Sequence, residues 1–251
     1  MKINGYSITL YEHALNRRMG DANSPSGRIR GSSSVLELFT DEGLTGIAFG
    51  GAGAAPQIKS MVEGILIGED PRQVTGLWKR MIDRAFKSGH DGVINDAISA
   101  LDVALWDLKA KFNDEPLWKT LGGSNPKVHA YASGLDYPLS DDEIEEWYGM
   151  MACTWGFKGG KLKVGLDQDA DIRRINRMKK GLERATTDPL LYIDANEVWN
   201  PKMAIRKVRE MEEHFDIAWV EEPARRWDFL GLRRISDQIK AAVCAGENLD
   251  T

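Results

Sequence analysis

The sequence contains few features that would place it in a specialised class of protein. Only two cysteines, Cys153 and Cys244, occur in its 251 residues, and their separation does not match the ligand spacing of a zinc site. Each lies within an apolar element, so we expect two buried, reduced thiols. The cysteines therefore do not indicate a disulfide framework or a metal centre.

The sequence also has no long apolar run and no strong charge of either sign. No stretch approaches the ~18 apolar residues that cross a bilayer, and the first residues lack the apolar segment of a signal peptide. A net charge of −5 gives no reason to expect nucleic acid or an anionic membrane as a partner. With 42% hydrophobic and 28% charged residues, the composition is that of a globular protein, and we expect a cytoplasmic one.

The first half of the chain is predicted to form three strands followed by helices. Partly alternating apolar residues predict strands over 2–12, 33–39 and 44–49. Helical periodicity follows and is clearest over 93–112. The glycine-rich segment 50–53 opens the helical part, but it lacks the full fingerprint of a phosphate-binding loop. We therefore expect an α+β unit.

Two irregular segments interrupt this pattern. Residues 17–31 are rich in Gly, Ser, Asn and Pro, and loops of this length often act as functional lids; a plain surface loop is the alternative. The cluster Gly-Gly-Ser-Asn-Pro at 122–126 marks the expected domain boundary. The predicted domains are therefore 1–125 and 126–251.

In the second half, strands alternate with helices. The predicted strands lie over 128–133, 160–164, 190–195, 217–221 and 242–247, and the predicted helices over 141–155, 168–184, 201–215 and 227–240. Such alternation predicts an α/β fold with a parallel sheet, either a barrel or open. A complete eight-stranded barrel takes roughly 250 residues by itself, so we expect an incomplete barrel. We also expect the stable molecule to contain roughly 120–150 further residues.

Three acidic residues end successive predicted strands in this half. Asp194, Glu221 and Glu247 are separated by 27 and 26 residues, about one strand-and-helix unit each. In a parallel barrel such strand ends converge on one face, where three carboxylates repel one another unless a cation neutralises them. Their spacing therefore predicts a metal site, and ligation by oxygen alone suits Mg²⁺.

Two lysines precede these acids on the predicted strand 160–164. Lys161 and Lys163 are two residues apart, so their side chains point to the same face of a strand. If that face is the barrel interior, mutual repulsion and partial burial lower the pKa of at least one lysine, as a general base requires. The alternative is an edge strand with two solvated lysines.

Together these motifs resemble the enolase superfamily, in particular its mandelate racemase subgroup, which includes acid-sugar dehydratases. The resemblance rests on Lys-Leu-Lys at 161–163, Asp-Ala-Asn at 194–196, Val-Glu-Glu-Pro at 220–223 and Gly-Glu-Asn at 246–248, and in the first half on 102–109 and 116–119. It covers essentially the whole chain. The implied fold is an α+β capping domain followed by the first five strands of a modified (β/α)7β TIM barrel.

The resemblance also implies a role for each site residue. Asp194, Glu221 and Glu247 match the Mg²⁺ ligands, Lys163 matches the base, and Lys161 matches its partner. Segments 17–31 and 50–56 resemble the capping loops that select the substrate. Further candidates for substrate contacts are Asn196, Glu222, His13, Arg28 and Arg30.

The implied reaction is removal of the proton next to a carboxylate, with Mg²⁺ stabilising the resulting enediolate. We expect an acid-sugar dehydratase that acts on a small hydroxy-carboxylate and forms a homo-oligomer. A racemase, epimerase or cycloisomerase is the alternative, because the His-Asp dyad that subgroup members usually carry on later strands is not matched by His90, His129 or His214. The alternatives of other classes are a non-catalytic remnant that binds metal or assembles through its capping domain, and an open doubly wound domain with coincidental acids.

Overall fold

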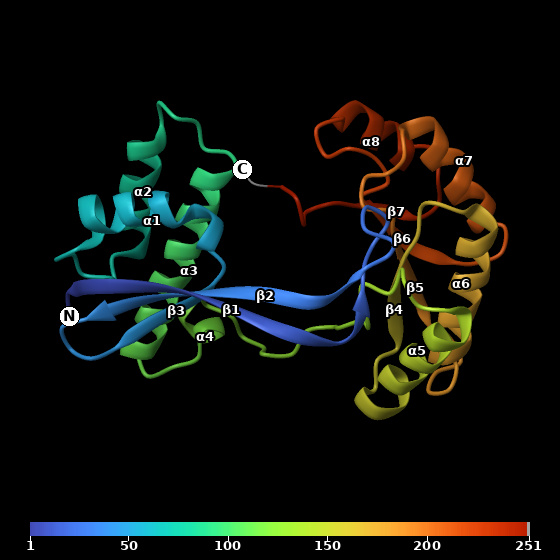
Figure 1. The fold of residues 1–251 in the computed structure, drawn as a ribbon, viewed down its shortest axis with the longest axis horizontal. Coiled ribbons are helices and arrows are strands. Elements are labelled where there is room, and N and C mark those ends of the chain that lie inside the picture. The colour runs from blue at the N-terminus through green and yellow to red at the C-terminus, as the bar shows by residue number, and fades with distance from the viewer. Residues whose placement is uncertain (250–251) are drawn as a thin grey trace. The chain divides into compact units, whose positions relative to one another are not determined.

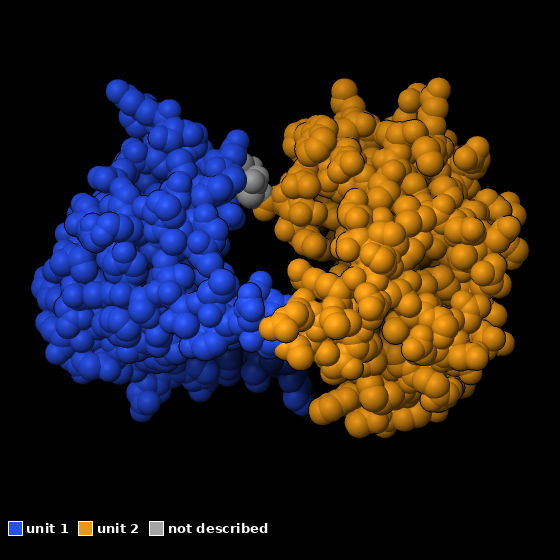
Figure 2. Space-filling view, in the orientation of Figure 1, with its two compact units in different colours: residues 1–13, 31–127, 250–251 blue, residues 14–30, 128–249 orange. Residues whose placement is uncertain are grey.

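The computed structural model describes residues 1–249 and divides into two compact units (Figure 2). The first unit comprises residues 1–13 and 31–127, and the second comprises residues 14–30 and 128–249. The segment 14–30 thus belongs with the second half of the chain. Residues 250 and 251, which end the expected second domain, lie outside the described range.

In the first unit, helices pack against a three-stranded sheet (Figure 1). The strands follow the order β1-β2-β3, and the pairing of β2 with β3 is antiparallel. The elements are β1 (Ile3–Met19), β2 (Arg28–Thr40), β3 (Thr45–Phe49), the 3-10 helix η1 (Ala52–Ala54), α1 (Ala55–Met61), the π-helix η2 (Val62–Leu66), α2 (Val74–Ala85), α3 (Val93–Phe112) and α4 (Leu117–Thr120). The helix predicted over 93–112 is confirmed.

Helix α3 packs closely on β3 because Gly46 has no side chain. A Cβ atom at Gly46 would lie 2.3 Å from the carbonyl oxygen of Ala104. The carboxylate of Asp107 accepts a hydrogen bond from the backbone nitrogen of Ile47 at 2.8 Å, and Lys111 Nζ donates to the Thr45 carbonyl at 2.8 Å. The helix therefore satisfies backbone groups of β3 that would otherwise need water.

The loop predicted over 17–31 is wrong at both of its ends, which belong to strands. Strand β1 continues to Met19 and β2 begins at Arg28, so only residues 20–27 form a turn. The strand residues here are polar because most of them are exposed, and an exposed hairpin has the composition of a loop. The tip is held within the second unit, because the Gly20 backbone nitrogen donates to the Leu135 carbonyl at 2.8 Å and the Gly20 carbonyl accepts from the Tyr137 backbone nitrogen at 3.2 Å.

The second unit is a four-stranded parallel sheet flanked by helices (Figure 1). Its elements are α5 (Asp141–Trp155), β4 (Gly159–Lys163), α6 (Gln168–Leu182), β5 (Leu190–Asp194), α7 (Pro201–Met211), β6 (Ile217–Glu221), α8 (Phe229–Ser236) and β7 (Ala242–Cys244). Helix α5 begins at a capping box between Ser140 and Glu143 and ends before Gly156, whose φ is 74°. The expected fold class, an α+β unit followed by part of a parallel barrel, is confirmed.

The sheet presents an apolar face to its helices and a polar face on the other side. Leu162, Ile193 and Val220 lie in the buried core with residues of α5 to α8. Alternate residues of the same strands therefore point to the opposite face. Close packing behind β4 depends on Gly160, where a Cβ atom would lie 2.7 Å from the ring of Tyr148.

Two sequence predictions about this unit are wrong. The strand expected over 128–133 is reduced to one bridge between Ala132 and Gly160, because Ala132 bonds to β4 while Val128 is 85% exposed. The cysteines are not both buried: Cys153 is exposed and Cys244 is half-buried. Cys153 follows the buried Ala152 on α5, and one helical step carries it to the solvent side. Among the described residues, no helix is long and apolar enough to cross a membrane.

Candidate active site and metal centre

Three carboxylates meet at the carboxyl ends of β5, β6 and β7. Asp194 and Glu221 are the last residues of β5 and β6 and are direct neighbours in the register of the sheet. Glu247 lies three residues beyond the end of β7, because this strand stops at Cys244 instead of reaching 247. One oxygen from each of the three carboxylates lies within 4.8 Å of the others. The first two are buried and the third is exposed.

Both lysines of β4 point into this carboxylate cluster. Lys161 and Lys163 are only 8% and 4% exposed. Lys163 Nζ lies 2.6 Å from Asp194 Oδ2, and Lys161 Nζ lies 2.6 Å from Glu221 Oε2 and 3.3 Å from Asp194 Oδ2. The polar face of the sheet thus brings opposite charges together in a compact cluster. Strand β4 lies at the edge of the four-stranded sheet, but its two lysines are buried against carboxylates and are not solvated.

The expected lowering of a lysine pKa is not found at Lys161. Burial lowers the pKa of its ammonium group. The hydrogen bond to Glu221 and the negative charges of Asp194 and Glu221 raise this pKa by a larger amount, so the net shift is upward. The sequence argument considered repulsion between the two lysines. In the structure, two carboxylates lie within 3.3 Å of Lys161 Nζ, and their effect on its pKa outweighs that of burial.

A buried polar network holds the backbone of β4 along the edge that does not pair with β5. The Tyr148 hydroxyl lies 2.6 Å from Asp136 Oδ2 and 2.5 Å from the Lys161 carbonyl oxygen. The second oxygen of Asp136 accepts a hydrogen bond from the Lys163 backbone nitrogen at 3.0 Å, and Arg174 donates to the Lys163 carbonyl at 3.4 Å. Burial raises the pKa of the Asp136 carboxyl. Because Asp136 precedes α5 in an irregular segment, the sequence contained no pattern that marks it.

Three aromatic rings lie close to the lysines. Tyr192 and Trp219 stack with ring centroids 3.9 Å apart, and Tyr131 contacts both, at 5.0 and 5.4 Å. Lys161 Nζ lies 5.8 Å from the centre of the Tyr131 ring, a cation–π distance. Tyr192 and Trp219 stand two residues before Asp194 and Glu221, so the strand period could have identified them as residues of the same face.

The backbone after β5 and β6 adopts unusual conformations next to the carboxylates. Asn196, Glu197 and Glu222 have φ values of 45°, 63° and 46°, in the left-handed region. Asn196 Oδ1 and Glu222 Oε2 are buried and have no hydrogen-bond partner among the described residues. Burial raises the pKa of Glu222, and the charges of Asp194, Glu247 and Glu197 add to the effect. Left-handed residues of this kind are typical of functional sites.

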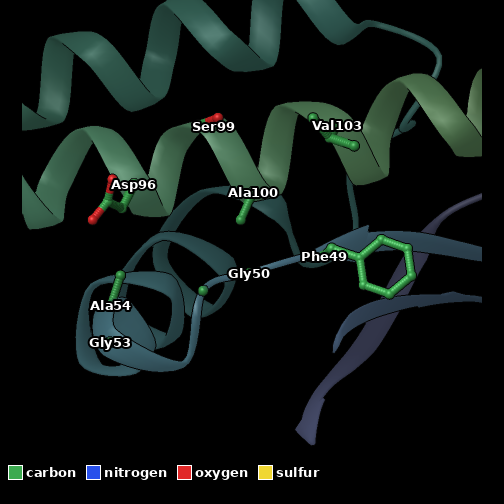
Figure 3. Close-up of a pocket in the computed structure, with 9 residues that line it drawn as sticks. Phe49, Gly50, Gly53, Ala54, Asp96, Ser99, Ala100 and Val103 are labelled. Carbon is green, nitrogen blue, oxygen red and sulfur yellow. The ribbon is translucent and has the colours of Figure 1, made fainter. Parts of the chain in front are cut away.

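The remaining candidates lie on β1, β2 and the segment after β3. His13 and Arg28 are exposed. Asn23, which the sequence analysis missed, donates from Nδ2 to the Asn196 carbonyl at 2.9 Å. The glycine-rich segment helps to line a pocket of about 340 Å³ in the first unit (Figure 3). Its lining residues are Phe49, Gly50, Gly51, Gly53, Ala54, Asp96, Ser99, Ala100 and Val103.

Comparison with protein families gives two matches along the chain. Residues 24–122 match the N-terminal domain of the mandelate racemase / muconate lactonizing enzyme family, and residues 145–251 match the enolase C-terminal domain-like family. The two matched segments correspond to the helix-covered antiparallel sheet and to the parallel sheet that carries the lysines and carboxylates.

Curated relatives and solved structures agree with these matches. The chain is 34% identical to the 3,6-anhydro-alpha-L-galactonate cycloisomerase of Streptomyces coelicolor, over 96% of this chain and 67% of that enzyme. It is 31% identical to the L-talarate/galactarate dehydratase of Salmonella typhimurium, over 99% of this chain and 64% of that enzyme. It is also 30% identical to the arabinonate dehydratase of Saccharolobus solfataricus, over 86% of this chain and 59% of that enzyme.

The structural match covers the same region. A racemase from Streptomyces coelicolor with bound magnesium superimposes with a TM-score of 0.88 at 31% identity, covering 98% of this chain and 70% of that one. The Salmonella dehydratase, liganded with Mg and L-lyxarohydroxamate, has a TM-score of 0.83 at 28% identity and is covered over 64% of its length. Matches to both halves, together with this identity, show that the chain belongs to the mandelate racemase / muconate lactonizing enzyme family of the enolase superfamily.

Proposed function

We propose that this protein is a Mg²⁺-dependent enzyme that removes the proton next to a substrate carboxylate. The observation that carries the proposal is the convergence of two buried lysines and three carboxylates on one face of the parallel sheet. Lys163 and Lys161 each lie 2.6 Å from a carboxylate oxygen. Such a cluster combines a potential base with a potential cation site within one small volume.

The donor set fits Mg²⁺. Asp194, Glu221 and Glu247 provide carboxylate oxygens within 4.8 Å of one another, and hard oxygen ligands are those that Mg²⁺ prefers. These three residues would hold the ion, and Asn196 and Glu222 add buried acceptor oxygens nearby. Bound there, Mg²⁺ would supply positive charge that stabilises the negative charge developing on the substrate carboxylate.

The lysines would handle the proton. Lys163 is assigned as the base, and its Nζ takes the proton from the carbon next to the carboxylate. Lys161 stands on the same face of β4 and is held by Glu221 at 2.6 Å, where its positive charge can assist the substrate carboxylate. A cation bound to Asp194 and Glu221 would compete for the carboxylate oxygens that pair with the two lysines, and would thereby free Lys163 to act as the base.

For the substrate we propose an acid sugar that loses water to give a 2-keto-3-deoxy acid. Support comes from the talarate/galactarate and arabinonate dehydratases among the relatives. After the proton has left, the bond between the adjacent carbon and its hydroxyl group breaks, and the hydroxide takes up a proton from a general acid and leaves as water. The chain spans 64% and 59% of the lengths of those two enzymes. The proposed reaction therefore rests on the lysines and carboxylates that this chain contains.

A cycloisomerase is the second candidate, favoured by the 34% identity to the anhydrogalactonate cycloisomerase. Proton removal is the same in that case, but the leaving oxygen on the adjacent carbon belongs to a ring, so the substrate opens without losing water. A dehydratase product is lighter than its substrate by one water, whereas a cycloisomerase product has the same mass as its substrate. A non-catalytic metal-binding protein is the alternative of another class, and it would exchange no proton.

Solvent exchange tests the shared step, and product analysis tests the rest. Acid sugars and anhydro-sugar acids are incubated with the protein and Mg²⁺ in D₂O, and exchange of the proton next to the carboxylate is followed by NMR. We expect Mg²⁺-dependent exchange with at least one compound, together with 2-keto acid formation. Lys163→Ala and Glu221→Gln should abolish both, whereas Lys79→Ala, on an exposed part of α2, should retain them. Full turnover of either site variant would disprove the mechanism.

A further inference from the structure

Glu247 differs from the other two carboxylates in how it is held. Asp194 and Glu221 are the last residues of strands and are buried. Glu247 is exposed and lies in the turn after β7, which is closed by a hydrogen bond from the Leu249 nitrogen to the Gly246 carbonyl at 3.1 Å. A side chain on a short turn keeps more freedom than one on a strand, so its place beside the other carboxylates needs support from outside the turn.

That support reaches the next residue, Asn248, from two directions. Arg226 Nη1 donates to the Asn248 carbonyl oxygen at 3.1 Å. The side-chain amide of Asn248 donates in turn to Glu222 Oε1 at 2.9 Å. Both contacts come from the segment that follows β6, so the turn after β7 is fastened to its neighbour.

Arg226 is itself held rigidly by Glu197. Its Nε and Nη2 lie 2.8 and 3.0 Å from the two carboxylate oxygens, a bidentate pair, and its backbone nitrogen lies 2.9 Å from the first of them. Glu197 is 3% exposed. The backbones are linked in the same order, because Glu197 donates to Glu222 and Glu222 donates to Cys244, both at 2.8 Å.

We propose that Arg226 is a positioning residue of the metal site. By holding the Asn248 carbonyl while bound to Glu197, it fixes the turn that brings Glu247 next to Asp194 and Glu221. The proposal rests on the proposed function, because it assigns Arg226 a role only where those carboxylates bind a cation. Residues that orient metal ligands from behind typically account for 10–100-fold in metal affinity.

Calorimetric titration with Mg²⁺, without substrate, tests this role independently of turnover. We expect Arg226→Ala to weaken Mg²⁺ binding by roughly 10–100-fold. Arg209→Ala is the matched control: Arg209 donates from Nε to the Gln238 carbonyl at 2.7 Å and from Nη2 to the Gln238 side chain at 2.8 Å. Like Arg226, Arg209 anchors a loop next to β7, but this loop precedes the strand and does not contain Glu247. The Arg209→Ala substitution should therefore leave Mg²⁺ affinity unchanged.

Arg226→Ala leaves the buried Glu197 with only the longer contact to the Arg225 guanidinium, at 3.5 Å, as a cationic partner and could unfold the protein. The double variant Arg226→Ala/Glu197→Gln removes that charge as well and should show the same loss of affinity. If either variant is folded and binds Mg²⁺ as tightly as the wild type, the role of Arg226 is overturned but the proposed function is not. If the unaltered protein shows no saturable Mg²⁺ binding, or if Asp194→Asn and Glu221→Gln do not weaken it, the proposed function fails and this inference fails with it.

Discussion

The ammonium nitrogen of Lys163 lies 2.6 Å from Oδ2 of Asp194, in the register where β4 pairs with β5. One carboxylate oxygen therefore faces both a potential base and the position where a cation would be bound. The lysine and the cation carry charge of the same sign, so they compete for Asp194. Cation binding and proton removal can therefore be separated by experiment. Substitution of the lysine alone should strengthen cation binding and abolish proton removal.

We expect Lys163→Met to bind Mg²⁺ more tightly while losing proton exchange. Repulsion between two charges about 4 Å apart is worth roughly 1 kcal/mol even in water and more in a protein site, so the affinity should rise about fivefold or more. Calorimetric titration measures it, with Lys79→Met as the exposed control. Weaker Mg²⁺ binding by Lys163→Met would contradict the arrangement.

Tyr148→Phe tests the network behind β4. The substitution removes one hydroxyl and leaves the buried Asp136 carboxylate and the Lys161 carbonyl without that partner. We expect a loss of about 1–3 kcal/mol in the free energy of unfolding, measured by urea denaturation. Tyr11→Phe, at a side chain that is 53% exposed, should change it by less than about 0.5 kcal/mol. Equal effects of the two substitutions would rule out a special role for the network.

Gly160→Ala tests the close packing of α5 and α6 on β4. A Cβ atom there would lie 2.7 Å from the Tyr148 ring and 3.0 Å from the Met178 sulfur. We expect this overpacking to cost about 1–3 kcal/mol in the free energy of unfolding. Gly76→Ala is the control, because nothing lies within 4 Å of its added Cβ in α2; it should gain up to about 1 kcal/mol. A neutral Gly160→Ala would mean that the helices can move away from the strand.

The buried carboxyl group of Asp171 should make the free energy of unfolding depend on pH. Burial raises its pKa from 3.8 to about 6 in the folded protein, so between these values the folded state binds more protons than the unfolded state. The contribution of Asp171 to stability therefore decreases as pH rises through this window, by at most about 3 kcal/mol. Urea denaturation of wild type and Asp171→Asn at pH 4 and pH 7 measures the effect. Parallel pH dependences of the two proteins would contradict it.

Much of the fold could be predicted from local patterns. The helix over 93–112 and the helix over 141–155 match α3 and α5 at both ends. Helical periodicity and a capping box both depend only on residues close together in the sequence. The strand at 128–133 and the loop at 17–31 could not be predicted correctly. Whether an extended segment forms a ladder depends on a neighbouring strand, and whether a polar segment is a hairpin depends on where it is anchored.

The sequence by itself determined the chemistry available to the site. Spacing alone placed Lys161, Lys163, Asp194 and Glu221 on one face at the strand ends, because side chains alternate along a strand and parallel strands share a direction. Only the tertiary structure decided which charge faces which. It paired Lys161 with Glu221 and Lys163 with Asp194, and it raises the pKa of Lys161, whereas a lowered pKa was expected for at least one of the two lysines. It also placed Asp136, Tyr148 and Arg226 behind the site residues, since contacts between residues far apart in sequence follow from packing and leave no periodic trace in the chain.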